Sequence, residues 1–491
     1  MKSYIISVDQ STQGTKALLF DDQGNLIKRV DKRHEQIVND KGWVSHNPVE
    51  IYQNTIEVII KVIETANISK EAIRALGISN QRETSVAWDK ETGKPFGEAI
   101  VWQCARAAKI AEALSDEDAR YVKEKTGMPA SPYFPAAKIA WILENSEEAK
   151  EKSRTGQICH GTIDSWLVYK LTKGLSYKTD YSNASRTQLF NIFDLQWDSR
   201  ICAMFGIDAS NLAEVCDSNA NFGETDLEGF LPNKVPIHSV LGDSHGALFG
   251  QGCLEVGMIK ATYGTGSSIM MNIGETPILS SHGVVTSLAW GMNGKVNYVL
   301  EGNLNYTGAV ITWIKDDLQL IDSPKEVEAL AKSAIQDDSL YLIPAFSGLG
   351  APYWDSNARA SIVGMTRTTG KAEIVRAAEE CIAYQITDII KSMSEDSKVK
   401  VSELRVDGGP TRDEYLMQFQ SDMADVIIKI PNAEELSGIG AAYAAGMATG
   451  VWQHNIHENI KRKEFRPKMK KDTVEKKYSG WKKAIQSVLR K

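Results

Sequence analysis

Short apolar runs alternate with longer amphipathic stretches along the whole chain, and this alternation predicts an α/β architecture. Two apolar runs at 4–8 and 16–20, separated by a polar turn over 9–15, predict a β-hairpin at the start. Further strands are predicted at 75–78, 235–241 and 404–406. Each of these runs ends in polar or glycine-rich sequence, which is where we expect the chemistry of such a fold.

The stretch 47–66 predicts the first long helix. Asn47 is a favourable N-cap, Pro48 occupies the first helical position, and Glu50 completes a pattern that resembles a capping box. A stripe of apolar residues from Ile51 to Val62 supplies the buried face.

Acidic residues occupy the ends of three predicted strands: Asp9, Asp243 and Asp407. A carboxylate at a strand end can hold a hydrated Mg²⁺ or accept the proton of an attacking hydroxyl, and phosphoryl transfer requires both functions. A helix cap or a turn is the alternative for any one of them. Because all three share this position, a functional role is as consistent with the sequence as a structural one.

Two similar hairpins occur, one in each half of the chain. Residues 4–20 are strand, D-Q-S-T-Q-G-T, strand; residues 258–272 are strand, Y-G-T-G-S-S, strand. This repetition suggests two lobes of related design with a ligand between their turns. Thr12, Thr15, Thr265 and Ser267 lie beside glycines, where hydroxyl and backbone N–H groups can bind phosphate oxygens. Neither a Walker motif nor a G-x-G-x-x-G after the first strand is present, which disfavours P-loop NTPases and nicotinamide-dependent dehydrogenases.

Several side chains suit a polyol. Arg82 and Glu83 pair a five-donor fork with an acceptor, which fits adjacent hydroxyls, although a structural salt bridge is equally common. Trp102 and Tyr133 can stack on a carbon skeleton or lie in the core. A hydrolase triad around His245 is disfavoured, because no G-x-S-x-G accompanies it.

Composition narrows the class further. The chain has 491 residues, 42% of them hydrophobic and 24% charged, which predicts two to four globular domains. The net charge of −7 disfavours a general nucleic-acid binder. The segment 461–491 is basic, with 13 Lys and Arg against 3 acids, and we interpret it as a solvated terminal helix rather than a nucleic-acid or lipid patch.

Six scattered cysteines without metal-ligand spacing predict reduced thiols, as in a cytosolic protein. No apolar run approaches the ~18 residues that a membrane span requires, and Asp9 follows the start too closely for a signal peptide. The sequence therefore predicts a soluble, cytoplasmic protein without stable membrane insertion.

Longer motifs then show a resemblance that covers nearly the whole chain. They are G-W-V-S-H-N-P at 42–48, I-S-N-Q-R-E-T at 78–84, A-I-V-W-Q-C at 99–104, D-Y-S-N-A-S-R-T at 180–187, T-Y-G-T-G at 262–266, P-A-F-S-G-L-G-A-P-Y-W-D at 344–355, R-V-D-G-G at 405–409 and G-A-A-Y-A-A-G at 440–446. With these motifs the sequence resembles the FGGY carbohydrate kinases, and among them most closely the glycerol kinases.

The resemblance implies two actin-like, ribonuclease-H-like lobes around a cleft for ATP and substrate. The N-terminal lobe, 1–250, would hold the acceptor and the first phosphate loop. The C-terminal lobe, 251–491, would form the nucleotide side and end in the basic segment. The implied ligands are ATP, Mg²⁺ and a small polyol or sugar, and the implied assembly is a homo-oligomer, either a dimer or a tetramer.

The resemblance also implies roles for individual positions. Asp243 would be the general base, and Asp9 and Asp243 would organise the metal through water. The other implied site residues are Thr12, Gln13, Gly14 and Lys16 in the first phosphate loop, Gly264, Thr265 and Gly266 in the second, Gly308, Ala309, Thr312, Gly409 and Asp413 along the nucleotide, and Arg82, Glu83, Trp102, Tyr133, Asp243, Ser244 and Ser268 around the acceptor.

The sequence departs from the glycerol-kinase pattern at several positions. Ser244 stands in place of Gln and Ser268 in place of Phe, both at the acceptor. Lys16 replaces an Arg of the phosphate loop, and Asp413 replaces an Asn on the adenine side. The stretch 217–224 lacks the histidine through which some glycerol kinases are activated, so that control is not expected.

We therefore predict an ATP- and Mg²⁺-dependent kinase acting on a terminal hydroxyl of a small polyol or ketose. The two serines predict a wide, polar pocket and an acceptor of four or five carbons, whereas His245 could fill the space and leave a glycerol kinase that makes glycerol 3-phosphate. Alternatives of other classes are an actin-like ATPase or filament, which needs no acceptor residues such as Arg82 and Trp102, and a non-catalytic sugar-binding regulator, which needs neither Asp9 nor Asp243.

Overall fold

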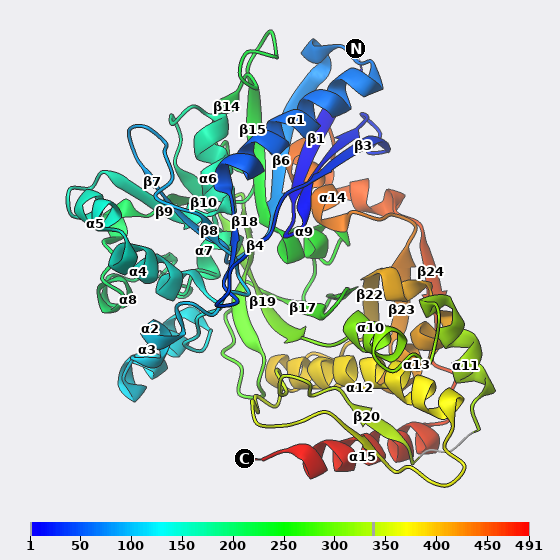
Figure 1. The fold of residues 1–491 in the computed structure, drawn as a ribbon. Helices are drawn as coiled ribbons and strands as arrows, with labels where there is room; N and C mark the ends of the chain where they lie inside the picture. Colours follow the sequence, from blue (N-terminus) through cyan, green and yellow to red (C-terminus); the bar gives the residue numbers. More distant parts are fainter. Residues whose placement is uncertain (1, 336–338, 491) are drawn as a thin grey trace.

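Two mixed β-sheets of the same topology organise the chain, and Figure 1 shows one in each lobe of the computed structural model, which describes residues 2–335 and 339–490. The first sheet has the order β14-β15-β6-β1-β2-β3. Its strands are β1 (Tyr4–Gln10), β2 (Gly14–Phe20), β3 (Leu26–Arg33), β6 (Ile73–Asn80), β14 (Glu224–Thr225) and β15 (Val235–Gly242).

The second sheet has the order β18-β19-β17-β16-β22-β23-β24. Its strands are β16 (Ile259–Tyr263), β17 (Ser267–Gly274), β18 (Val285–Met292), β19 (Lys295–Leu304), β22 (Glu403–Gly408), β23 (Ile427–Pro431) and β24 (Arg462–Phe465). In the first sheet β1 pairs antiparallel with β2 and parallel with β6; in the second, β16 pairs antiparallel with β17 and parallel with β22. The two hairpins that look alike in the sequence therefore occupy equivalent places in two equivalent sheets.

A third sheet of five strands, in the order β4-β5-β8-β7-β9, lies in the first half of the chain beside the first sheet. Its strands are β4 (Ile37–Val38), β5 (Val44–His46), β7 (Ser85–Asp89), β8 (Ala99–Ile100) and β9 (Ile158–Thr162). Short two-stranded pairs join β10 (Lys178–Asp180) to β13 (Glu214–Cys216), β11 (Phe190–Asn191) to β12 (Gln196–Trp197), and β20 (Tyr341–Ile343) to β21 (Ser361–Val363).

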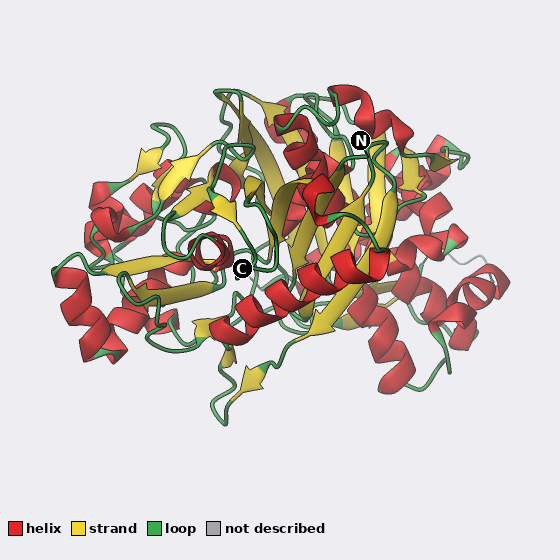
Figure 2. Ribbon diagram, turned by 90° about the horizontal axis from the view of Figure 1, so that it is seen from above, coloured by secondary structure: helices red, strands yellow, loops and turns green. Residues whose placement is uncertain are grey.

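Helices flank the sheets (Figure 2). They are α1 (Pro48–Ala66), α2 (Ala108–Glu112), α3 (Asp116–Thr126), α4 (Pro135–Asn145), α5 (Glu147–Arg154), α6 (Ile163–Leu171), α7 (Tyr181–Ser185), α8 (Ser199–Met204), α9 (Asp243–Gly250), α10 (Gly308–Asp316), α11 (Val327–Ser333), α12 (Lys371–Ser397), α13 (Glu414–Ala424), α14 (Leu436–Ala448) and α15 (Lys471–Val488). Among the described residues, none of these helices combines the length and the apolar character that crossing a membrane would require.

The predicted helix at 47–66 is α1, and Asn47 caps it by accepting hydrogen bonds from the backbone N–H groups of Val49 and Glu50. The capping box expected at Glu50 is not formed. Instead its carboxylate accepts a hydrogen bond from the backbone N–H of Glu35, 3.4 Å away, because β3 leads the chain past the start of the helix.

The first hairpin has a tighter turn than the sequence predicts. Asp9 and Gln10 belong to β1 and Gly14 begins β2, so that 11–13 form the turn. Gly14 must lack a side chain, because a Cβ there would lie 2.5 Å from the carbonyl oxygen of Lys32 on the neighbouring strand. Asp9 is therefore held by strand pairing on both sides, by β2 and by β6.

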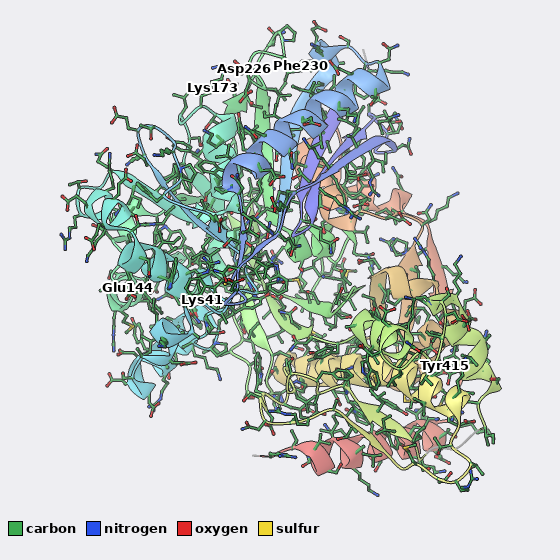
Figure 3. All side chains as sticks on the ribbon, in the orientation of Figure 1. Lys41, Glu144, Lys173, Asp226, Phe230 and Tyr415 are labelled. Atoms are coloured by element: carbon green, nitrogen blue, oxygen red, sulfur yellow. The ribbon has the colours of Figure 1, made fainter. Side chains whose placement is uncertain are left out.

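The basic C-terminal segment contains β24 and α15. Trp481 and Ile485 of α15 are fully buried, and the Trp481 indole N–H donates to Asp388 Oδ2 at 2.7 Å. The basic residues lie on other faces of this helix, as in the solvated terminal helix that we expected. Ordinary surface ion pairs occur elsewhere, such as Lys173 and Asp226, labelled at the outer end of the first lobe in Figure 3, with 2.7 Å between Nζ and Oδ2.

Helix α14 comes late in the sequence but packs on the first sheet, against β1, β6 and β15 (Figure 1). Our sequence boundary places everything after residue 250 in the second lobe, whereas this helix completes the first. It meets α9 backbone to backbone: a Cβ on Gly440 would lie 1.9 Å from the carbonyl oxygen of Gly246, and one on Gly250 would lie 2.2 Å from that of Leu436. Glycine on both helices is what allows this close approach.

We predict that Gly440→Ala lowers the free energy of unfolding by at least about 1–3 kcal/mol, because an added methyl group forces α9 and α14 apart. Urea unfolding of the purified protein measures the loss. Gly97→Ala is the matched control, since a Cβ at Gly97 meets no atom within 4 Å. Equal stability of the two variants would contradict close packing at this helix contact.

Candidate active site

A buried network of charged side chains lies where the two lobes meet. Arg82 follows the end of β6, and its Nε donates to Asp243 Oδ1 at 3.1 Å. Its Nη1 and Nη2 donate to the two carboxylate oxygens of Glu301 on β19, at 3.0 and 2.9 Å. One guanidinium group therefore links the first residue of α9 to the second sheet.

A second arginine completes the network. Arg186, just after α7, donates from Nη1 to Glu301 Oε2 at 2.9 Å and from Nε to Glu83 Oε1 at 2.5 Å. Burial alone would raise the pKa of Glu301, but Arg186 and Arg82 outweigh it and hold that pKa well below its ordinary value. Glu301 is therefore a permanent anion between two permanent cations.

The predicted aromatic residues lie next to the first phosphate turn. The indole N–H of Trp102 donates to Thr12 Oγ1 at 3.0 Å, and the rings of Trp102 and Tyr133 meet edge to face with 5.6 Å between centroids. Burial raises the pKa of the Tyr133 hydroxyl, which stays neutral. The structure thus brings together residues predicted for the acceptor and for the nucleotide.

Asp9 is almost completely buried near the same place. Ser79 Oγ donates to its Oδ1 at 3.2 Å, and Lys16 Nζ lies 3.8 Å from its Oδ2. Burial raises the pKa of Asp9 to about 6; Lys16 opposes the shift, while the carboxylates of Glu435 and Asp243 add to it. Negative charge around Asp9 is therefore only partly compensated.

Lys16, predicted in the phosphate loop, is not free. It lies within β2, and its Nζ donates to Glu435 Oε2 at 2.5 Å, while Arg29 holds Oε1 of the same carboxylate at 2.5 Å. Any phosphate oxygen that binds Lys16 must compete with Glu435.

The second glycine-rich turn, between β16 and β17, packs against the start of α10. The backbone N–H groups of Gly308 and Ala309 donate to the carbonyl oxygens of Gly264 and Thr265, at 2.9 and 3.0 Å. A Cβ on Gly266 would lie 2.2 Å from the carbonyl oxygen of Leu304, so the turn requires glycine there. These contacts make the turn rigid and use both of those helix N–H groups.

Four of the residues predicted along the nucleotide line one cavity of about 610 Å³: Gly308, Thr312, Gly409 and Asp413. Ala309 and the two phosphate turns do not line it. Glu379 of α12, for which we predicted no role, also lines it. Both carboxylate oxygens of Glu379 are buried and receive no hydrogen bond from the described residues, and burial together with Asp413 raises its pKa to about 10. Glu379 is therefore protonated at neutral pH.

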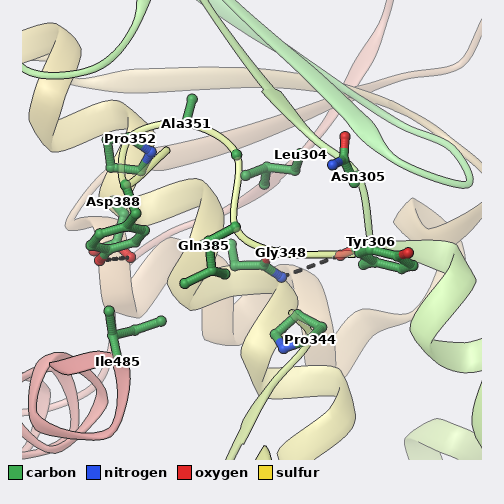
Figure 4. A pocket seen from close by; sticks show the side chains of 13 residues that line it. Leu304, Asn305, Tyr306, Pro344, Gly348, Ala351, Pro352, Gln385, Asp388 and Ile485 are labelled. Carbon is green, nitrogen blue, oxygen red and sulfur yellow. Dashed lines mark hydrogen bonds between the residues drawn. The ribbon is translucent and has the colours of Figure 1, made fainter. Parts of the chain in front are cut away.

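A second cavity, shown in Figure 4, is only about 20 Å³ and so has room for one water molecule. Gln385 Nε2 crosses its wall to the carbonyl oxygen of Tyr306 at 3.2 Å, and the Tyr353 hydroxyl donates to Asp388 Oδ2 at 2.7 Å. None of the predicted site residues lines this cavity, which we regard as part of the core.

The two serines that depart from the family pattern are both partly accessible. Ser244 follows Asp243 at the start of α9, and Ser268 lies on β17, where Lys260 Nζ approaches its Oγ at 3.4 Å. His245 is fully buried, with neither ring nitrogen hydrogen-bonded to a described residue, and burial beside Arg82 lowers its pKa well below the ordinary value.

Arg186, Glu301 and Lys260 were not predicted as site residues. A signal existed for two of them, because Glu301 and Lys260 are single charges in apolar strand sequences, V-L-E-G and M-I-K-A. Charges in such positions are rare unless they are paired. Arg186 lies within the D-Y-S-N-A-S-R-T motif, but its partners cannot be identified from that motif alone.

Comparisons with known proteins agree with this geometry. The N-terminal domain of the FGGY family of carbohydrate kinases matches residues 4–250, and its C-terminal domain matches 259–449. A glycerol kinase of Petrotoga mobilis is 46% identical over 99% of this chain and 98% of its own length. The structure of Plasmodium falciparum glycerol kinase with ADP has a TM-score of 0.93 at 35% identity, covering 100% of this chain and 99% of that one. A xylulose kinase of Lactobacillus acidophilus shares the fold, with a TM-score of 0.89 at 22% identity and coverage of 99% and 98%. The predicted family and the two-lobed, actin-like fold are confirmed.

We predict that Glu301→Gln costs about 3–5 kcal/mol of unfolding free energy, because it leaves Arg82 and Arg186 buried with one carboxylate fewer. Urea unfolding measures this loss. Glu275→Gln serves as the control, since Glu275 pairs with Lys295 at the surface, 3.5 Å apart, and such pairs contribute about 0–1 kcal/mol. A loss at Glu301 no larger than the control would show that the network is not a unit.

We also predict that Glu379→Gln changes how stability depends on pH. The raised pKa means that the folded protein binds a proton that the unfolded chain releases above its ordinary pKa of 4.5, so native stability falls as pH rises from there toward about 10. The variant lacks this loss, and its stability relative to the native protein rises by about 1.4 kcal/mol per pH unit between pH 5 and 8. Unfolding at several pH values tests this, with Glu395→Gln at an exposed position as the control. A pH-independent difference for Glu379→Gln would contradict the prediction.

Proposed function

The chain belongs to the FGGY family of carbohydrate kinases, a phosphotransferase family with an alcohol group as acceptor, and we propose that it transfers the γ-phosphoryl group of ATP to a terminal hydroxyl of a small polyol. The observation that carries this proposal is the partly exposed carboxylate of Asp243, held by the buried Arg82 and Glu301 pair next to the two phosphate turns. Glycerol kinases at 46% identity over nearly the full chain support glycerol as the acceptor. They support it better than the four- or five-carbon acceptor that Ser244 and Ser268 suggested.

Asp243 is suited to take the proton of the attacking hydroxyl. Its side chain is 37% exposed, and Arg82 engages Oδ1 only, which leaves Oδ2 for the substrate. Because Arg82 cannot move without breaking its bonds to Glu301, it fixes the orientation of the carboxylate as well as its charge. A general base must lie within hydrogen-bond reach of the proton that it removes, and this arrangement holds it there.

The acceptor would lie between the charged network and the aromatic pair. Arg82 uses three of its five N–H groups on Asp243 and Glu301, so two remain for substrate hydroxyls. Arg186 donates to Oε1 of Glu83, so that Oε2 of the same carboxylate can accept a hydrogen bond from a substrate hydroxyl. Trp102 and Tyr133, at their edge-to-face contact, offer apolar surface for the carbon skeleton.

The nucleotide would occupy the cavity of about 610 Å³ lined by Gly308, Thr312, Gly409 and Asp413, with its phosphates toward the two turns. The Plasmodium falciparum structure, which contains ADP, supports a nucleotide in a fold of this kind. Thr12 and Thr265 are the hydroxyl residues of the two turns, and Lys16 can supply a positive charge when phosphate displaces Glu435.

Asp9 and Asp243 fit a hydrated Mg²⁺. The carboxylate of Asp243 adds to the raised pKa of Asp9, and a divalent cation would relieve that repulsion. No group of three metal-ligating side chains occurs within the described ranges, which agrees with an ion bound through water and phosphate oxygens. When bound, the ion would neutralise charge on the transferring phosphoryl group.

An actin-like filament or a non-catalytic regulator is less consistent with the site. A filament protein needs the nucleotide cavity but has no use for a carboxylate held by a buried arginine next to an aromatic pair. A regulator needs the acceptor residues but has no use for a carboxylate at Asp243 close enough to raise the pKa of Asp9.

We predict that Asp243→Asn lowers kcat by about 10²–10⁴-fold while ADP binding is nearly unchanged, because the amide keeps the contact to Arg82 but cannot accept a proton. Steady-state kinetics with glycerol and calorimetric titration with ADP make the two measurements. Asp316→Asn, at an exposed position of α10, is the control with native kinetics. A variant of Asp243 with more than about a tenth of native kcat would contradict its role as base.

A further inference from the structure

Lys138 is a charged side chain in the core of the first lobe. It lies in α4, within the apolar sequence P-A-A-K-I-A-W, and is fully buried. Lysine is almost never fully buried unless it is paired with a carboxylate. Within residues 2–335 and 339–490, however, Lys138 forms no ion pair, and its Nζ donates only to the backbone carbonyl oxygen of Tyr133.

The stability of α4 does not explain this lysine. Lys138 lies at the fourth helical position, near the positive end of the helix dipole, where a cation is unfavourable. Removing a charge from water into apolar surroundings costs free energy as well. Because both effects oppose folding, a functional role is favoured over a structural one.

The hydrogen bond to Tyr133 connects Lys138 with the acceptor site. The backbone N–H of Tyr133 donates to Ser131 Oγ at 3.2 Å, and its carbonyl oxygen accepts from Lys138. Both backbone polar groups of Tyr133 are therefore held, and they fix the direction of its ring. That ring has its centroid 5.9 Å from Lys138 Nζ and meets Trp102 edge to face.

The charged and titratable groups that face Lys138 come from the elements packed on α4. Besides Tyr133 they are Glu83, just before β7, and Cys104 and Arg106, just before α2. Burial lowers the pKa of Lys138 to about 7; Glu83 and Cys104 oppose this shift, and Arg106 adds to it. The amine is therefore only partly protonated at neutral pH, and Glu83 is the carboxylate that most favours the charged form.

We propose that Lys138 is a positioning residue for the acceptor, which acts by holding the carbonyl group of Tyr133 and by balancing the charge of Glu83. This inference rests on the proposed function. Lys138 does not touch the substrate, because its side chain is fully buried. A charge-assisted hydrogen bond is roughly twice as strong as a neutral one, so loss of the proton loosens Tyr133. Acceptor binding therefore weakens as pH rises through the pKa of the lysine, whereas ATP binding, which uses other residues, does not.

The test compares KM for glycerol between the native protein and Lys138→Met over the range pH 6.5–9. Methionine is an unbranched side chain without a charge or an N–H donor. Both proteins retain Asp9 and Asp243, so the ratio of their KM values at each pH reports Lys138 alone. We expect a ratio of about ten or more at pH 6.5, because a hydrogen bond from a charged group is lost. The ratio should fall toward one at pH 9, where the native lysine is neutral, with kcat changed by less than about threefold.

The native protein supplies a measurement that needs no variant. Its KM for glycerol should rise by about tenfold between pH 6.5 and 9, while its KM for ATP stays constant. Ile142→Val is the matched control, since Ile142 is buried one turn further along α4, and it should keep the native KM and the native pH profile. If Lys138→Met does not fold, the native profile still decides the matter.

The outcomes separate this inference from the proposed function. Phosphorylation of glycerol with a native KM that does not rise with pH, or with a ratio that is the same at pH 6.5 and 9, would overturn the positioning role and leave the kinase proposal standing. An equal rise in KM for ATP would also overturn it, because the lysine would then act on the whole fold. Failure to phosphorylate glycerol at any pH would overturn the proposed function, and this inference with it.

Discussion

The carboxylate of Glu301 is the contact on which the site depends, because it is an anion fully buried between the guanidinium groups of Arg82 and Arg186. Charges in such surroundings persist only when each is paired and hydrogen-bonded, and removing one member leaves the others uncompensated. Arg82 in turn holds Asp243. The first lobe supplies the carboxylate of Asp243, and the second lobe, through Glu301 of β19, holds the arginine that orients it. The arrangement therefore depends on both halves of the chain.

The close backbone contact between α9 and α14 also holds Asp243 in place. Helix α9 begins with Asp243. Its glycines Gly246 and Gly250 lie on the side that faces α14, and because neither has a side chain, α14 can lie directly against α9. Because α14 follows β23 of the second sheet, packs on the first sheet and is followed by β24 of the second, the chain passes three times between the lobes. A rigid α9 positions Asp243 from the backbone side, while Arg82 positions it from the side chain. The two constraints are independent, and together they leave the carboxylate little freedom.

Local patterns were enough to predict the strands, the first helix and the acids at strand ends, because apolar periodicity and turn chemistry act over a few residues. Asp9 and Asp243 were found in this way. The partners of Arg82 were not, since Glu301 is 219 positions away and only the pairing of β17 with β19 brings it there. The early turn boundaries were wrong for the same reason, and the packing of α14 on the first sheet was not predicted: both are decided by contacts between distant segments. The sequence signal for Glu301 was its position as a single acid within an apolar strand.

Lys260 shows how a buried charge constrains the residues around it on the second sheet. A buried amine must find acceptors, and burial lowers its pKa even though Asp407 opposes the shift. Thr262 and Ser268 provide those acceptors. The hydroxyl of Ser268 therefore satisfies an interior charge with its lone pair. An apolar residue at 268 would remove one partner of Lys260. A substitution at this position therefore always changes how the interior charge is satisfied.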